Sequence, residues 1–219
     1  MKKDNMGAHI KTLALSLMAS SLTIPAMADG LLQPQSYLSL SAGLSNSPGT
    51  CASLYTSGAS CSEKSSVYRL GYGYHFTPTW GMEISYGDFG RAKEEGMFAV
   101  PPPGVPGGGP IPYVWTYEAV GWEIAATGTL PLNESFSLIG KLGFIRANIG
   151  QETSMITTTN EVWHSVSHDD SNHISPSLGV QYDFNRDFAL RVSHDRFGKL
   201  GKSFKTNVSA TYASLILKF

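Results

Sequence analysis

The sequence predicts an all-β fold: an eight-stranded antiparallel up-and-down transmembrane β-barrel with short turns at one rim and long loops at the other. Three observations predict this fold. The chain begins with an export signal, apolar and polar residues alternate with a period of two, and the connections between the alternating segments are short and long in turn. Composition agrees, because only 15% of the residues are charged while the chain holds 23 Gly, 10 Tyr and 10 Phe.

The N-terminal segment has the three regions of a secretory signal peptide. Lysines precede an apolar stretch over residues 12–24, and Ala26-Met27-Ala28 forms a small-residue cleavage site. We expect residues 1–28 to be cleaved and residues 29–219 to form one β-barrel domain. No later segment approaches the roughly 20 apolar residues that a transmembrane helix needs. The formal net charge of −1 argues against a nucleic-acid partner.

Each predicted strand separates into an apolar row and a polar or small row when every second residue is taken. In WGMEISYG (80–87), aromatic and aliphatic residues occupy one face, and Gly, Glu and Ser occupy the other. The same split predicts eight strands, at residues 37–44, 68–76, 80–87, 120–127, 136–145, 177–184, 188–193 and 207–219.

The connections between these strands alternate in length. Three are predicted to be tight turns, at 77–79, 131–134 and 185–187. Four are predicted to be long loops, at 45–66, 90–116, 148–172 and 198–206. Because barrels of this kind have short periplasmic turns and long extracellular loops, the even strand count places both chain ends in the periplasm.

Charged side chains decide which row faces lipid. A cation at the bilayer midplane costs about 2 to 4 kcal/mol, so the charged rows must face inward and the aromatic rows must face lipid. The inward charges are predicted to be Arg69, Glu83, Glu123, Lys141 and Arg191. Aromatic residues also gather beside the short turns, as an interfacial girdle does: Tyr74, Phe76, Trp80, Phe136, Tyr182, Phe184, Phe188 and Phe219.

Cys51 and Cys61 are the only cysteines, and they lie in a stretch rich in Ser, Thr and Gly. In an exported protein this pair predicts a disulfide bond. A loop of this length gains about 2 to 3 kcal/mol in the entropic model, which pins the loop without deciding the fold. A redox or metal-binding pair is the alternative.

These segments resemble the OmpA-type transmembrane domain and related small eight-stranded outer-membrane β-barrels. The resemblance spans nearly all of the mature chain and rests on YRLGYGYHFTPTWGMEISYGDFG (68–90), GTLPLNESFSLIGKLGFIRA (128–147) and SLGVQYDFNRDFALRVSHDRFG (177–198). It implies the outer membrane of a Gram-negative bacterium as the location. The C-terminal SLILKF is similar to the family's assembly signal, which implies that Phe219, Leu217 and Leu215 are read by the barrel-assembly machinery.

The resemblance also implies a packed, charged lumen. By position, Arg69 would lie beside Glu83 and Glu123 beside Lys141, with Arg191 facing them. We interpret this network as structural, since unpaired buried charges are costly; the alternative is an ion path gated by these pairs. Pro176 departs from the pattern because it removes a ladder donor, and we expect a bulge there.

Residues for catalysis or metal binding give weak signals. Outer-membrane lipid A deacylases place a nucleophilic Ser two positions after a His, but His194 is followed by Asp195 and Arg196. His164, His168 and His173 are weak metal-ligand candidates whose spacing fits no established site. We expect no enzyme, no metal and no other cofactor.

The sequence therefore predicts a structural and surface-interaction protein that supports envelope integrity, attachment or adhesion through its extracellular loops. Expected partners are outer-membrane lipids and lipopolysaccharide, the assembly machinery, and a host or cell-surface ligand. The proline-rich segment 101–112 is either a mobile surface loop or a partner-docking segment. The alternatives are a narrow pore for small solutes or ions and, less favoured, a lipid-modifying enzyme.

Overall fold

The structure is a computed structural model that describes residues 36–48, 60–98, 110–156, 162–199 and 207–219. These residues belong to one compact unit, Gln33–Phe219. The predicted signal peptide and Cys51 lie outside the described residues. The described part contains nine strands: β1 (Ser36–Asn46), β2 (Ser60–Ser62), β3 (Lys64–His75), β4 (Trp80–Phe98), β5 (Ile111–Pro131), β6 (Phe136–Ile156), β7 (Val162–Asp183), β8 (Phe188–Gly198) and β9 (Val208–Lys218).

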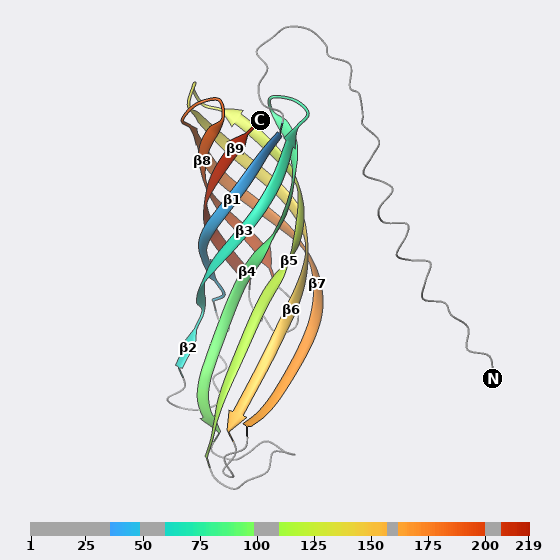
Figure 1. The fold of residues 1–219 in the computed structure, drawn as a ribbon, viewed down its shortest axis with the longest axis vertical. Coiled ribbons are helices and arrows are strands. Elements are labelled where there is room, and N and C mark those ends of the chain that lie inside the picture. Colours follow the sequence, from blue (N-terminus) through green and yellow to red (C-terminus); the bar gives the residue numbers. More distant parts are fainter. Residues whose placement is uncertain (1–35, 49–59, 99–109, 157–161, 200–206) are drawn as a thin grey trace, which may run out of the picture. The chain divides into compact units, whose positions relative to one another are not determined.

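Eight of the strands close into a ring. They pair in the order β4-β3-β1-β9-β8-β7-β6-β5, and a further β4–β5 pairing completes the circle. Every pairing is antiparallel, and the first and last strands of the ring in the sequence, β1 and β9, lie side by side (Figure 1). The short strand β2 stands outside the ring and pairs with Lys93–Glu95 of β4. The predicted eight-stranded antiparallel barrel is therefore confirmed. No helix of the described residues is long and apolar enough to cross a membrane.

Four neighbouring strands are much longer than the other four. Strands β4 to β7 have 19 to 22 residues, whereas β1, β3, β8 and β9 have 11 or 12. Their outer halves continue past the ring as a four-stranded sheet, which we call the external sheet (Figure 1). The predicted loops 90–116 and 148–172 are therefore wrong over most of their length. Their alternation continues, but the outward row becomes polar, as at Arg91 and Lys93, because it no longer faces lipid.

The three tight turns are built alike. In each, two successive backbone N–H groups donate to the carbonyl of the first residue of the next strand, which closes the turn. A Thr or Asn side chain at the start of the turn then accepts from backbone N–H groups two and three residues later. The capping residues are Thr77, Asn133 and Asn185, and the three predicted short turns are confirmed.

Two β-bulges interrupt the ladders, at Asp88/Gly90 in β4 and at Arg196/Gly198 in β8. Each contains a Phe-Gly pair whose glycine has a positive φ, of 149° at Gly90 and 71° at Gly198. The two hairpins that carry the bulges, residues 70–91 and 178–199, share identical residues at seven aligned positions.

The bulge expected at Pro176 is wrong. The β6–β7 register passes through it unshifted, and β7 pairs with β8 only from Ser177 onward.

The barrel is apolar outside and polar inside. Large aliphatic and aromatic side chains point outward and stay exposed around the ring, as at Leu40, Tyr68, Trp122 and Leu178. Ser, Gln and charged side chains of the alternate rows are buried. This arrangement is the reverse of a water-soluble protein and requires lipid around the barrel.

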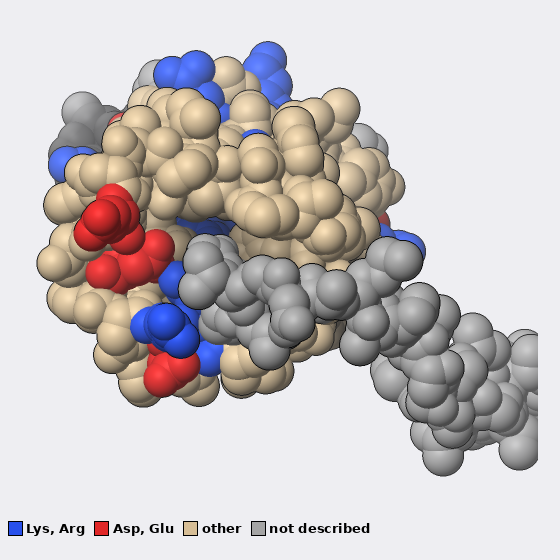
Figure 2. All heavy atoms as spheres, turned by 90° about the horizontal axis from the view of Figure 1, so that it is seen from above, with Lys and Arg blue, Asp and Glu red and all other residues tan. Residues whose placement is uncertain are grey.

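The rim with the short turns differs from the apolar wall. Exposed aromatic residues lie beside the turns, as predicted for a girdle: Phe76, Trp80, Phe136, Phe184, Phe188 and Phe219. Figure 2 looks onto the end of the barrel where the C-terminus lies, and shows Lys, Arg, Asp and Glu side chains on this end. One ion pair near the chain terminus joins Lys218 Nζ to Asp183 Oδ1 at 2.6 Å. The polar headgroup region begins at this rim.

Candidate functional site: the interior of the barrel

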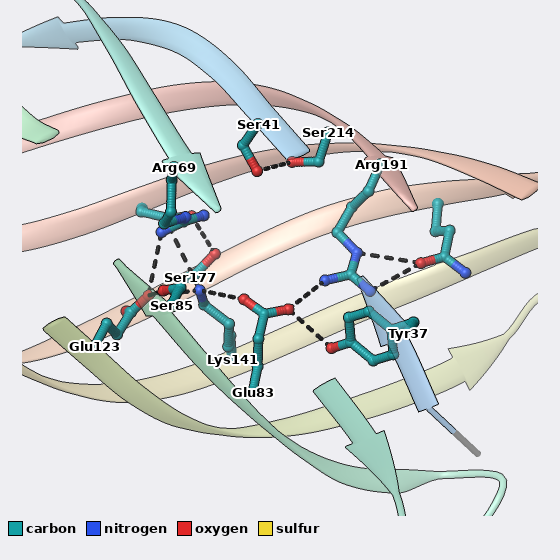
Figure 3. A network of polar contacts seen from close by, with 12 residues as sticks. Tyr37, Ser41, Arg69, Glu83, Ser85, Glu123, Lys141, Ser177, Arg191 and Ser214 are labelled. Atoms are coloured by element: carbon teal, nitrogen blue, oxygen red, sulfur yellow. Dashed lines mark hydrogen bonds and ion pairs between the residues drawn. The ribbon is translucent and has the colours of Figure 1, made fainter. Parts of the chain in front are cut away.

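The inward rows bring the five predicted charges together in the lumen. They come from five different strands, β3, β4, β5, β6 and β8, and each is at most 8% exposed: Arg69, Glu83, Glu123, Lys141 and Arg191. Alternation alone aims them inward, because each occupies the same phase of its strand as neighbouring buried Ser, Gly or Ala residues. The candidate site is thus a single buried cluster (Figure 3).

Lys141 and Glu123 lie at the centre of this cluster. Lys141 Nζ bonds to Glu123 Oε2 at 2.8 Å and to Glu83 Oε1 at 3.2 Å. Arg69 Nη1 donates to Glu123 Oε2 at 3.2 Å, and Arg191 Nη1 donates to Glu83 Oε2 at 3.1 Å. Arg69 does not pair with Glu83 as the resemblance implied. The β3–β4 register sets Arg69 opposite Gly87 and Glu83 opposite Gly73, well apart along the strands.

Asp195 is the member of the network that sequence reasoning missed. It is completely buried, accepts from Arg69 Nη1 at 2.6 Å, and accepts from Ser177 Oγ at 2.5 Å. The predicted strand ended at Ser193, yet two further residues in the same phase reach Asp195. Extending the alternation from Arg191 would have found it.

Neutral groups complete the network at its periplasmic side. Tyr37 Oη donates to Glu83 Oε2 at 2.8 Å, and Gln181 Oε1 accepts from Arg191 Nε and Nη2 at 3.1 and 3.0 Å. Both arginines also lie against aromatic rings: Arg69 Cζ is 4.2 Å from the centre of the Tyr212 ring, and Arg191 Cζ is 5.3 Å from that of Tyr37. Alternation had placed Gln181 on the inward row but not Tyr37 or Tyr212, because Tyr also occurs on the outward rows, as at Tyr68.

The cluster is electrically balanced. Three cations, Arg69, Lys141 and Arg191, face three carboxylates, Glu83, Glu123 and Asp195, and every one of the six has an oppositely charged partner. Balance matters because an unpaired charge in a dry interior is strongly destabilising. A cavity of about 10 Å³ remains among these side chains and neighbouring serines, which is room for roughly one water molecule.

An apolar layer covers the cluster on its outer side. We call it the apolar plug; its members come from six strands and are at most 2% exposed: Val67, Phe89, Ala92, Ala119, Ile145, Ala147, Ile149, Phe197, Val208, Ala210 and Tyr212. Phe89 and Phe197, the two bulge phenylalanines, meet edge to face across the lumen with ring centroids 5.1 Å apart. On each of the five strands that carry both, the plug residues lie nearer the external end than the charges do, so the plug lies between the network and the outer surface.

The remaining predicted residues lie away from this cluster. His164 and His168 are exposed on the outward row of β7, whereas His173 belongs to the opposite row, so the three do not converge. Leu215, Leu217 and Phe219 are exposed on the outward side at the short-turn end. Among the described residues no group of three His, Cys, Asp or Glu side chains is placed to hold a metal.

Two more predictions involve residues outside the described ranges. Cys61 lies in β2 and its sulfur is in a disulfide bond; Cys51 lies outside the described residues, so the Cys51–Cys61 pairing stays a prediction. Of the proline-rich segment, residues 101–109 are also outside, and Ile111 and Pro112 begin β5.

The external sheet carries paired charges on its outward face. Arg91 Nη2 donates to Glu118 Oε1 at 2.6 Å, and this hydrogen bond raises the pKa of Arg91. Lys93 pairs with Glu95 on the same strand, and Arg146 Nη2 lies 3.8 Å from Asp170 Oδ2. These side chains are accessible to water, so each pair contributes little to stability.

Comparison with known proteins gives a family for this architecture. The family model described as outer membrane protein beta-barrel domain matches residues 13–215. The comparison with curated proteins found no match.

Solved structures with a similar fold include three small barrels. Ail, the attachment invasion locus protein of Yersinia pestis, is 16% identical, with 86% of this chain and 100% of that chain covered and a TM-score of 0.47. Neisserial surface protein A is 13% identical, with 84% and 97% covered and a TM-score of 0.47. The N-terminal barrel of Pseudomonas aeruginosa OprF is 13% identical, with 85% and 98% covered and a TM-score of 0.47. The chain belongs to the outer membrane protein β-barrel domain family, and its location is the outer membrane of a Gram-negative bacterium.

Proposed function

We propose that this protein is a non-conducting barrel with a structural and surface-interaction role. The observation that carries the proposal is the closed interior, in which a balanced network of six charges is covered by the apolar plug. An eight-stranded barrel is narrow enough for side chains to fill it. Contact with the surroundings is then left to the outer wall, the external sheet and the loops.

The proposed partners follow from these surfaces. Outer-membrane lipids, including lipopolysaccharide, contact the apolar wall and its polar margin. The barrel-assembly machinery reads Leu215, Leu217 and Phe219 during insertion. A host or cell-surface ligand is bound by the external sheet and loops, which gives the protein a part in attachment, adhesion or envelope integrity.

No catalytic role is proposed. His194, the one candidate base near the last strands, lies on the outward row and shares a 3.0 Å hydrogen bond between its Nδ1 and Thr211 Oγ1. The buried acid Asp195 points the other way, into the lumen, and is held by Arg69 and Ser177. Base and acid therefore face opposite sides of the barrel wall.

Planar-bilayer recording tests the closed lumen against the pore alternative. Purified, folded protein should give no discrete conductance events, and neither Lys141→Gln nor Glu123→Gln should create a steady current, because the plug remains in place. Regular single-channel events in the unaltered protein, with a size that changes when Lys141 or Glu123 is neutralised, would instead establish a pore.

Cell-binding measurements test the surface role. Replacing residues 99–109 with a two-residue turn should reduce the attachment of expressing cells. The matched lumen control is Ser41→Ala with Ser214→Ala, which removes both partners of a 2.8 Å interior hydrogen bond and should be nearly neutral. Attachment that survives trimming of each external loop in turn would contradict the proposal.

A further inference from the structure

Three of the four ring strands that run toward the short-turn rim end in the same way. They are β3, β7 and β9, and each is followed by a phenylalanine at the rim. Counting back from that phenylalanine in steps of two gives the outward row of the strand. The rows are Leu70, Tyr72, Tyr74 and Phe76 in β3, Leu178, Val180, Tyr182 and Phe184 in β7, and Ala213, Leu215, Leu217 and Phe219 in β9. Each row is apolar throughout and closes on a phenylalanine.

Backbone hydrogen bonds give the same alignment of the three strand ends. In each case the phenylalanine N–H donates to the carbonyl of the first residue of a neighbouring strand. The acceptors are Trp80 of β4 for Phe76, Phe188 of β8 for Phe184, and Ser36 of β1 for Phe219. The three phenylalanines therefore hold equivalent places at the rim.

Strand β5 also runs toward this rim, and it does not carry the pattern. Leu132 holds the place of the phenylalanines, because its N–H donates to the carbonyl of Phe136, the first residue of β6. Steps of two back from Leu132 give Leu130, Gly128 and Ala126. Outward side chains of β5 are exposed around the ring as those of β3 and β7 are. Contact with lipid therefore does not by itself require the aromatic ending.

The likeness of the three segments is confined to the outward row. The inward residues just before the phenylalanines are His75, Asp183 and Lys218, which share no common chemistry. An extended chain that pairs with the edge of another sheet presents every second side chain to the same surface. Such a partner would meet nearly the same side chains on β3, β7 and β9.

Chain direction separates these strands from the other strands that have an aromatic residue at the rim. In β4, β6 and β8 the aromatic residue comes first, at Trp80, Phe136 and Phe188. A partner edge that pairs in one orientation reads a segment in one direction, so these three strands present their rows in reverse order.

We propose that β3 and β7 carry two further segments, residues 70–76 and 178–184, that the barrel-assembly machinery binds during insertion. The inference rests on the proposed reading of Leu215, Leu217 and Phe219 in β9. A surface that accepts the outward row of β9 also accepts two rows with the same spacing, the same direction and the same final phenylalanine.

The positions of the segments in the chain give the proposal a consequence for barrel closure. Strand β3 lies early in the chain and β9 lies at its end, yet β1, which pairs with both, closes the barrel against β9 (Figure 1). Holding the β3 and β9 segments on one machine raises the effective concentration of the two chain ends for each other. The β1–β9 pairing would then form with less search.

Insertion assays with and without the machinery test the proposal. Full-length variants are diluted from urea into vesicles that contain the purified machinery and, separately, into vesicles of short-chain lipid without it. Heat-dependent gel mobility measures the folded fraction over time. With the machinery, Phe76→Ala with Phe184→Ala should slow insertion about tenfold, because two apolar contacts with the partner are lost. Without it, the variant should insert at the rate of the unaltered protein. Phe76→Tyr with Phe184→Tyr should keep the unaltered rate in both.

The matched control is Phe136→Ala with Phe188→Ala, which removes two rim phenylalanines that are 42% and 44% exposed and begin upward strands. It should insert at the unaltered rate in both kinds of vesicle. Equal slowing of the two alanine double variants by the machinery would overturn the proposal, because the rings would then act only as a girdle. Slowing of the Phe76/Phe184 variant in lipid alone would also overturn it, since the defect would lie in folding.

Phe219→Ala separates this inference from the one on which it rests. Slow machinery-dependent insertion of Phe219→Ala, with the Phe76/Phe184 variant unaffected, would refute the two internal segments alone. An unaltered rate for Phe219→Ala would refute the proposed reading of β9.

Discussion

Single residues in the lumen act through charge balance more than through any one contact. Arg69 touches two carboxylates, and for one of them, Asp195, no other cation of the described residues lies within hydrogen-bond distance. Five of the six charges could be predicted from alternation and lipid cost. The sixth charge, Asp195, was missed because its outward neighbours, His194 and Arg196, are polar. The apolar outward row ends before them, so the predicted strand also ended too early.

Asp195→Asn should destabilise the barrel by about 3 kcal/mol or more, since it removes one charge from a buried, balanced set and leaves Arg69 partly uncompensated. Urea titration in lipid vesicles, followed by tryptophan fluorescence or gel mobility, measures the change. Asp170→Asn is the matched control, because the carboxylate is exposed and its partner Arg146 is 3.8 Å away; we expect under about 1 kcal/mol there. Equal shifts for the two variants would show that the network does not govern stability.

At the scale of elements, the strand ends at the short turns are easier to predict from the sequence than the strand ends on the external side. The turn residues Thr77, Asn133 and Asn185 mark the periplasmic ends, and lipid imposes an apolar row on everything up to the membrane surface. Beyond that surface nothing requires an apolar outward row. The sequence of the external sheet therefore resembles polar loops, although pairing between neighbouring strands continues as far as Phe98 in β4 and Ile156 in β6.

The bulges are elements that depend on glycine. Gly198 has a φ of 71°, in the left-handed region, and a Cβ there would meet nothing closer than 3.5 Å, so strain and not collision decides the effect of a side chain. Gly198→Ala should cost about 1 to 2 kcal/mol. Gly140→Ala is the control, since its added Cβ would meet nothing within 4 Å, and it should be neutral or slightly stabilising. The same urea titration measures both; a neutral Gly198→Ala would mean that the bulge can relax.

On the scale of the whole molecule, the two similar hairpins place their bulges opposite one another. Phe89 and Gly90 lie near the end of the hairpin 70–91, and Phe197 and Gly198 lie at the same place in the hairpin 178–199. Each bulge turns its phenylalanine inward, and the two rings meet in the lumen. The plug therefore depends on a contact between two hairpins that are distant in the sequence, and the sequence of either hairpin alone does not predict that contact.

The plug should decide whether water and solutes reach the lumen from outside. Ser193→Cys introduces a thiol at an inward position that is 6% exposed, on the network side of Phe197. In otherwise unaltered cells, a membrane-impermeant maleimide should leave this thiol unlabelled, because the apolar layer excludes the reagent. Combining it with Phe89→Ala and Phe197→Ala removes both rings and should make labelling rapid. Asn46→Cys, exposed at the outer margin, should be labelled equally in both backgrounds. Rapid labelling of Ser193→Cys with both phenylalanines present would mean that the lumen is open to the outside. That result would contradict the proposal of a non-conducting barrel.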